Sequence, residues 1–192
     1  MNTFNGSKSL SLENKLLDNL SRSFEVDLPQ ASDMDTYLDK ILPIVRPLSE
    51  DLRETKFYLN KGWLEFRDDE KWHDTVLHFF NKDGEYLISN NGNLSGGNWR
   101  FMRPSNKFIL NNSELFELAF LDEQFFILRK HGDQKRLGKR KYFVLIHEPI
   151  GKRLEWRDAM ELLFNKYRNN NNWLIIILII VLLLIGIVFL LS

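Results

Sequence analysis

Residues 75–102 have the sequence TVLHFFNKDGEYLISNNGNLSGGNWRFM, and this stretch decides the fold. Short runs of aromatic and branched residues alternate with the turn residues Lys82-Asp83-Gly84 and Asn90-Asn91-Gly92. Such runs are typical of β-strands, and Asp-Gly and Asn-Gly supply the backbone freedom that tight hairpins need. The stretch therefore predicts three consecutive antiparallel strands, at 75–81, 86–89 and 98–102.

The same pattern continues on both sides, between Phe57 and His147. Further strands are predicted at 58–67, 107–110, 115–121, 124–130 and 142–147. Most links are of hairpin size, which indicates an antiparallel meander that forms a curled sheet or a small barrel. Several strands carry apolar residues on both faces, so we expect flanking helices or a partner to cover the outer face.

Helical periodicity flanks the strands. Apolar residues from Tyr37 to Val45 follow a cap at Ser32 or Asp33, and a second short helix is predicted around 48–53. The stripe from Trp156 to Tyr167 predicts an amphipathic helix at 153–168. We expect this stripe to pack on the sheet, with the membrane interface and a partner helix as alternatives.

An apolar run from Leu174 to Leu191, preceded by Trp173, contains no charged residue. Its eighteen residues would span roughly 27 Å as a helix, close to the thickness of a bilayer's hydrocarbon core. Basic residues, among them Lys166 and Arg168, precede the run. The sequence thus predicts a tail-anchored, single-pass membrane protein whose N-terminal domain is cytoplasmic, at the inner membrane if the source is bacterial.

The chain accordingly divides into five predicted parts. They are a flexible or partly helical arm at 1–31, a β-rich domain at 32–152, the amphipathic helix at 153–168, an Asn-rich hinge at 169–172 and the anchor at 173–191.

Composition excludes several functional classes. The chain has 26 basic and 26 acidic residues, so no overall field favours nucleic acid. It has no cysteine, which excludes disulfides and thiolate zinc sites. No phosphate-loop or nucleophile-elbow motif occurs, and the four histidines lack metal-site spacing. The acidic loop 68–74 is interpreted as solvated. We therefore expect no enzyme, no cofactor, no metal and no catalytic residue.

Five short segments resemble the lipocalin-like β-meander domains common in Bacteroidetes, over residues 57–147. They are Lys61-Gly62-Trp63, residues 79–86 with their aromatic-x-x-Asp-Gly hairpin, Gly96-Gly97-Asn98-Trp99, residues 107–110 and residues 125–128. The resemblance implies a meander, and it raises the hypothesis of a ligand pocket; an ordinary core is the alternative. The residues that would line such a pocket are Trp63, Phe79, Trp99, Phe101 and Phe125.

The densest polar cluster lies before the last strand. Its seven cations are Arg129, Lys130, Lys135, Arg136, Lys139, Arg140 and Lys141, and Asp133 is the one acid among them. On a membrane-tethered domain such a loop could contact anionic lipid. The alternatives are nucleic acid, which the balanced charge disfavours, and a solvated loop.

Two functional hypotheses follow. In the first, the β domain is a protein-interaction or scaffold module with a protein partner. In the second, it is a membrane-tethered binder of a small apolar ligand or lipid. An apolar cavity of a few hundred Å³ within the sheet would favour the second, and a filled interior would favour the first.

Overall fold

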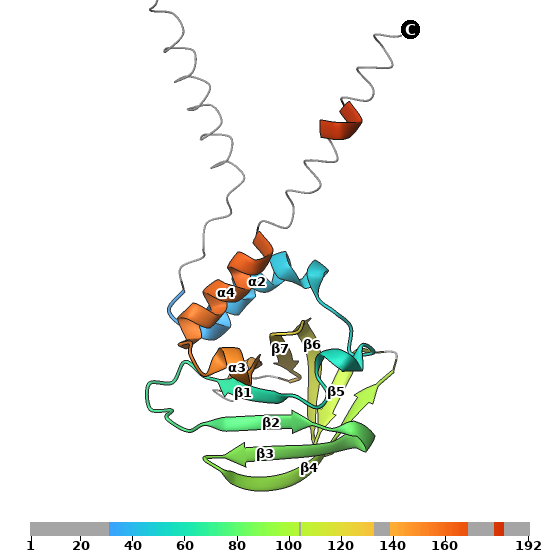
Figure 1. Ribbon diagram of the computed structural model, residues 1–192, viewed down its shortest axis with the longest axis vertical. Coiled ribbons are helices and arrows are strands. Elements are labelled where there is room, and N and C mark those ends of the chain that lie inside the picture. The colour runs from blue at the N-terminus through green and yellow to red at the C-terminus, as the bar shows by residue number, and fades with distance from the viewer. Residues whose placement is uncertain (1–30, 104, 133–138, 169–178, 183–192) are drawn as a thin grey trace, which may run out of the picture. The chain divides into compact units, whose positions relative to one another are not determined.

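The computed structural model describes residues 31–103, 105–132, 139–168 and 179–182. Its main compact unit is Pro29–Tyr167, in which the strands form a closed barrel (Figure 1). Each strand pairs antiparallel with the next, and β8 closes the barrel against β1. The strands are β1 Gly62–Phe66, β2 Val76–Phe80, β3 Glu85–Asn90, β4 Asn93–Met102, β5 Lys107–Leu110, β6 Glu114–Leu121, β7 Phe125–Lys130 and β8 Tyr142–His147. The helices are α2 Met34–Val45, α3 Glu148–Gly151 and α4 Trp156–Arg168, with 3₁₀ turns η1 Arg46–Leu48, η2 Thr55–Phe57 and η3 Lys82–Gly84.

This architecture confirms the predicted mainly β fold with flanking helices, and it is consistent with the lipocalin-like resemblance. Two strands, β5 and β8, have the predicted limits. Strand β4 begins at Asn93 rather than at Asn98. The reason is the turn before it: Asn91 and Gly92 have φ of 48° and 87°, so two residues suffice to reverse the chain.

Two local predictions before β1 were wrong. The helix predicted at 48–53 is absent beyond Leu48, which ends η1, because residues 49–53 bond to the barrel instead: Glu50 N donates to the carbonyl of Leu121 at 2.8 Å, and Leu121 N donates to Ser49 Oγ at 2.9 Å. The first strand begins at Gly62 rather than at Tyr58. Tyr58 is fully buried, and its hydroxyl donates to the carbonyl of Leu52 at 2.9 Å.

Aromatic rings fill the barrel interior around Tyr58. The ring of Tyr58 stacks on Phe126, with centroids 5.4 Å apart, and meets Trp99 edge-on at 5.6 Å. Phe80 and Phe108 complete the layer, each in edge contact with Phe126 at 5.5 and 5.6 Å. Separations of this size are those of rings in direct contact, so this part of the interior is packed core.

The outer face of β6, β7 and β8 is buried as well. Phe125 and Ile127 point away from the interior residues Phe126 and Leu128, yet all four are fully buried. Helices α2 and α4 lie on this side of the barrel (Figure 1), and Phe120 of β6 contacts the ring of Tyr167 at 5.4 Å. The predicted packing of the C-terminal amphipathic helix on the sheet is thereby confirmed.

A buried carboxylate fixes the end of α4. Asp122, in the β6–β7 hairpin, is 5 % exposed and accepts hydrogen bonds from Lys166 Nζ at 2.8 Å and from the Tyr167 hydroxyl at 2.6 Å. It also accepts from the backbone N–H groups of Gln124 and Phe125, at 2.7 and 2.6 Å. One side chain thus closes the hairpin and holds the helix.

The arm at 1–30, the hinge at 169–172 and most of the anchor, including Trp173, Leu174 and Leu191, lie outside the described residues. Ile179–Leu182 are described and helical. Within the described part of the chain, no helix has the length and apolar character needed to cross a membrane.

Candidate functional site

A polar network lies inside the barrel, next to the aromatic layer. Glu65 of β1 and His78 of β2 occupy interior positions of their strands, and Tyr86 of β3 lies between His78 and the core. His78 Nε2 is 3.1 Å from Glu65 Oε2, and His78 Nδ1 is 2.6 Å from the Tyr86 hydroxyl. Arg67 Nε donates to the other carboxylate oxygen, Oε1, at 2.6 Å. Every polar group of this interior chain therefore has a partner.

The proton arrangement follows from the carboxylate. Burial alone would raise the pKa of Glu65, but the hydrogen bonds from His78 and Arg67 outweigh it, and the pKa lies below its ordinary value. An ionised carboxylate can only accept, so His78 Nε2 donates to it, and Nδ1 on the other side of the ring is bonded to the Tyr86 hydroxyl. Burial, and then the charge of Glu65, raises the pKa of Tyr86. The network holds β1, β2 and β3 together within the interior.

Sequence reasoning missed this network. Its signal was present, because Glu65 and His78 both lie at alternate positions with interior residues, Trp63 on β1 and Phe80 on β2. A charged residue at an interior position needs a partner on a neighbouring strand.

An open groove of about 650 Å³ lies on the outside of the barrel, beside β1. The outer face of β1, the loop between β1 and β2, and the connection from α3 to α4 form its walls. It is lined by Leu64, Glu65, Phe66, Arg67, Asp68, Asp69, Glu70, Trp72, Asp74, Thr75, Gly151, Lys152, Leu154, Glu155 and Trp156.

Two tryptophans give the groove its apolar character. Trp72 and Trp156 are each half-buried, as are Leu64 and Leu154. The guanidinium of Arg67 lies over the Trp72 ring, 3.4 Å from its centroid, which holds that ring against the end of β1. Partly exposed tryptophans in a concave surface are typical of binding sites.

The charge of the groove is strongly negative. Six acidic residues and two basic residues line it. The two basic residues are already paired, Arg67 with Glu65 and Lys152 with Glu148. Four carboxylates, those of Asp69, Glu70, Asp74 and Glu155, form no ion pair within the described part of the chain. The acidic loop that the sequence predicted as merely solvated thus lines a concave surface.

A glycine sets the shape of this groove. Gly151 ends α3 and is buried against β1; a Cβ atom there would lie 3.0 Å from the ring of Phe66 and 3.2 Å from Leu64. These distances are tighter than most real Cβ contacts, so the Phe66 and Leu64 side chains would have to shift by a few tenths of an ångström to admit a larger residue at this position.

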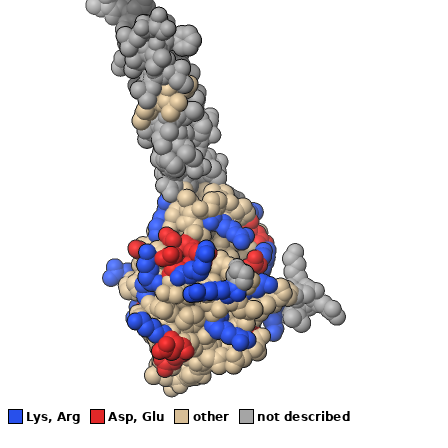
Figure 2. Space-filling view, turned by 90° about the vertical axis from the view of Figure 1, so that its right-hand side faces the viewer, with Lys and Arg blue, Asp and Glu red and all other residues tan. Residues whose placement is uncertain are grey.

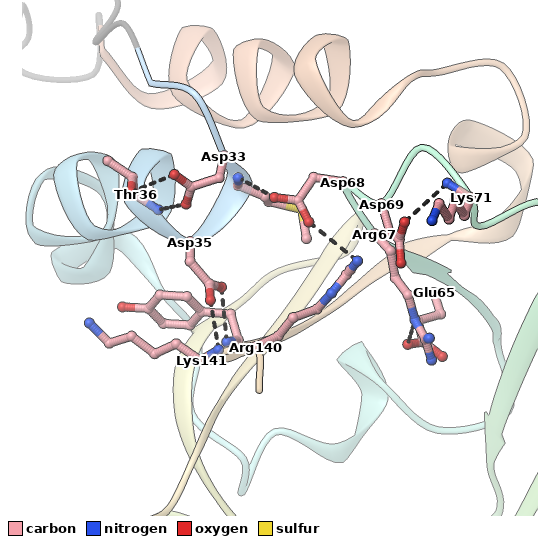
Figure 3. A network of polar contacts seen from close by, with 12 residues as sticks. Asp33, Asp35, Thr36, Glu65, Arg67, Asp68, Asp69, Lys71, Arg140 and Lys141 are labelled. Atoms are coloured by element: carbon pink, nitrogen blue, oxygen red, sulfur yellow. Dashed lines mark hydrogen bonds and ion pairs between the residues drawn. The ribbon is translucent and has the colours of Figure 1, made fainter. Parts of the chain in front are cut away.

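The α2 helix is tied to the same region by acids (Figure 3). Asp33 caps the helix as predicted, its Oδ1 accepting from Thr36 N at 2.8 Å. Asp68 accepts from Met34 N at 2.7 Å and lies 3.3 Å from Arg140 Nη2. Asp35 accepts from the backbone N–H groups of Lys141 and Tyr142, at 2.7 and 3.2 Å. These contacts join α2, the β1–β2 loop and β8.

The predicted ligand-pocket residues do not line one space. Trp63 is fully buried in the interior, and its Nε1 donates to the carbonyl of Tyr58 at 3.0 Å. Trp99 and Phe101 pack against the same interior cluster. Phe79 and Phe125 point to the outside of the barrel, because their neighbours Phe80 and Phe126 point inward. Three of the five are thus packed around the core, and two belong to the outer face.

Part of the predicted basic cluster forms ion pairs with acidic residues from other elements. Arg129 pairs with Glu117, Arg140 with Asp68, and Lys141 with Asp39. Lys135 and Arg136 lie outside the described residues, and Lys130 and Lys139 form no ion pair with a described residue. Both signs of charge are intermixed on the face shown in Figure 2. Sequence reasoning saw one opposing acid because it counted only neighbours along the chain.

The described residues contain no group of three or more His, Asp or Glu side chains placed to hold a metal ion. Comparisons with family models, curated proteins and solved structures give no match to this chain.

Proposed function

We propose that this protein is an interaction module that binds a cationic segment of a partner protein in the groove beside β1. The observation that carries the proposal is the combination of two half-exposed tryptophans and four carboxylates that form no ion pair with a described residue, all along one open groove. A basic segment with an aromatic or aliphatic side chain would match both features. That side chain would pack on Trp72 or Trp156, while the cations of the segment would pair with the carboxylates of the groove.

The interior of the barrel supports the same choice. An apolar ligand would need a cavity of a few hundred Å³ among the inward-facing side chains. In the described part of the barrel, the residues around Tyr58 are rings in mutual contact, and Glu65, His78 and Tyr86 bond one another. Hence the interior favours an interaction module over a carrier of a small apolar molecule.

The proposal is tested with a defined probe. A fluorescently labelled peptide, Lys-Gly-Trp-Gly-Lys, is titrated with the full chain in neutral detergent micelles, and binding is measured by anisotropy against micelles alone. The peptide should bind, should bind more weakly as salt is raised, and should outcompete its counterpart Glu-Gly-Trp-Gly-Glu.

The decisive variant is D69N/E70Q/D74N. Exposed ion pairs contribute about 0.2–1 kcal/mol each, so three lost pairs predict a roughly 3- to 140-fold weaker Kd. The matched control is E54Q/D83N/E123Q, which removes three exposed acids that do not line the groove. Equal weakening by both triple variants would mean that net charge alone drives binding, and the proposed site would be wrong.

We further propose that the segment from Leu174 to Leu191 holds this module at a membrane. The support is its length and its lack of charge. Deleting 173–192 should move the protein from the alkali-resistant membrane fraction to the supernatant while its far-ultraviolet circular dichroism keeps the β signal. Recovery of the truncated chain in the membrane fraction would contradict this role.

A further inference from the structure

A second, smaller pocket lies at the end of the barrel where β1, β7 and β8 meet. Its volume is about 260 Å³, and it is lined by Glu65, Phe66, Arg67, Lys130, Lys139, Arg140, Tyr142, Phe143 and Val144. In the strand register, Lys130 of β7 lies opposite Phe116 of β6, and Glu65 of β1 lies opposite Leu145 of β8. Phe116 and Leu145 both belong to the interior cluster. Paired residues of antiparallel strands share a face, so Lys130 and Glu65 are on the inward face of the barrel at this end.

Four cations from three segments converge on this pocket. Arg67 follows β1, Lys130 ends β7, and Lys139 and Arg140 precede β8. Arg67 is neutralised by Glu65, whose two carboxylate oxygens are occupied by Arg67 and His78. Lys130 and Lys139 form no ion pair with a described residue, so the pocket keeps an excess of positive charge.

Arg140 supplies an independent observation. Its Nη2 faces Asp68 at 3.3 Å, and Figure 3 shows the side chain directed toward that carboxylate. Its Nη1 is buried and has no hydrogen-bond partner among the described residues. A buried guanidinium nitrogen without an acceptor is costly, and a rotation of the side chain toward an anion in the pocket would provide the acceptor.

We infer that this pocket binds a phosphate group. A volume of about 260 Å³ is below that of sites for drug-sized ligands, which begin at roughly 300 Å³, and it suits a compact anion. The planar Arg140 guanidinium matches phosphate oxygens, and the Lys130 and Lys139 ammonium groups supply point charges around them. The phosphate group belongs either to a soluble phosphate ester or to the headgroup of a membrane lipid. The pocket shares Glu65, Phe66 and Arg67 with the lining of the peptide groove, whereas Lys130, Lys139 and Arg140 line this pocket and not the groove.

The first experiment uses inorganic phosphate. Isothermal titration calorimetry is performed on the full chain in neutral detergent micelles. The variant K130Q/K139Q removes the two cations that carry no ion pair, so it breaks no described salt bridge. Phosphate should bind the wild-type chain and bind this variant up to roughly 30-fold more weakly, at up to about 1 kcal/mol per cation.

The matched control is K56Q/K82Q, which removes two exposed lysines away from the pocket. It should leave phosphate binding unchanged. R140K keeps the charge but replaces the planar guanidinium, and it should also weaken binding. The inference is overturned if wild-type protein binds no phosphate, or if K130Q/K139Q and K56Q/K82Q bind it equally well.

A second arm distinguishes the two sources of phosphate. The titration is repeated in nanodiscs of phosphatidylcholine alone and in nanodiscs that also contain phosphatidic acid, whose phosphate is a monoester. Loss of phosphate binding only in the phosphatidic acid nanodiscs would assign the pocket to a lipid headgroup. Equal binding in both would assign it to a soluble phosphate ester. Because the peptide titration uses other residues, either proposal can fail without the other.

Discussion

Replacing Trp63 tests directly whether the barrel interior is packed core. The side chain is fully buried on β1, its Nε1 donates to the carbonyl of Tyr58 at 3.0 Å, and its ring meets Phe126 edge-on at a centroid distance of 5.7 Å. The variant Trp63→Ala removes both the ring and the hydrogen bond, whereas Trp63→Phe removes the donor and keeps a smaller aromatic ring.

The expected magnitudes follow from these contacts. Truncating a buried Trp to Ala costs about 3–5 kcal/mol when the surroundings cannot collapse into the space. Leaving the buried Tyr58 carbonyl without its donor costs about 1–3 kcal/mol, which is the effect expected for Trp63→Phe. Wild-type, Trp63→Phe and Trp63→Ala should therefore form a descending series in the free energy of unfolding.

The assay is urea unfolding of the full chain in mild detergent, followed by far-ultraviolet circular dichroism. If Trp63→Ala is too unstable to fold, Trp63→Phe still gives a measurable shift. The control is Trp72→Ala at the groove, where a half-exposed ring stacked on Arg67 should cost about 1 kcal/mol or less. A Trp63→Ala variant that unfolds within about 1 kcal/mol of wild type would mean that the ring borders open space, and the ligand-carrier hypothesis would regain its support.

Three other substitutions probe separate parts of the structure. Glu65→Gln should destabilise the protein at neutral pH: because the folded pKa of Glu65 is lowered below 4.5, its contribution is present above that value and is lost as the pH falls through the folded pKa. The difference in unfolding free energy between wild type and Glu65→Gln should thus shrink as the pH falls from neutral to below 4.5, and a difference that stays constant would exclude this ionised contact. Asp122→Ala leaves the Lys166, Tyr167 and hairpin donors without their shared acceptor, which should lower the free energy of unfolding by at least about 3 kcal/mol. Hydrogen exchange in α4 should become faster, and unchanged exchange would show that the helix is held by its apolar face alone. Gly151→Ala should destabilise by about 1–3 kcal/mol through contact with Phe66 and Leu64, as measured by thermal unfolding, whereas a neutral result would show that α3 can move away freely.

Much of the fold was predictable because its signals are local. Asn91-Gly92 fixes a two-residue hairpin through its own backbone angles, and the Asp33 cap bonds a residue three positions away. The amphipathic stripe of α4 likewise predicted which face would be buried. What failed was decided by distant partners: the segment at 49–58 follows bonds to Leu121 and burial of Tyr58 rather than its own helix propensity.

The candidate sites were even harder to predict from the sequence, because residues that are far apart in the chain form them. The sequence places Asp69 and Trp156 far apart, and only the closing of β1 against β8, followed by α3, brings both to one groove. Likewise, the cations before β8 were recognised as a cluster, but their acids, Asp39, Asp68 and Glu117, come from three other elements. A count of charges along the chain cannot anticipate pairing across a barrel.

The tryptophan indole N–H signals provide the most direct test of the proposed groove. The full chain, labelled with ¹⁵N at tryptophan, is titrated with unlabelled Lys-Gly-Trp-Gly-Lys, and each signal is assigned by substitution to Phe. Trp72 and Trp156 line the groove, whereas the Trp63 and Trp99 indoles donate to the carbonyls of Tyr58 and Asn81. The signals of Trp72 and Trp156 should move with peptide concentration while those of Trp63 and Trp99 stay in place. Movement of the Trp63 and Trp99 signals without the other two would place the peptide in the barrel and contradict the proposed function.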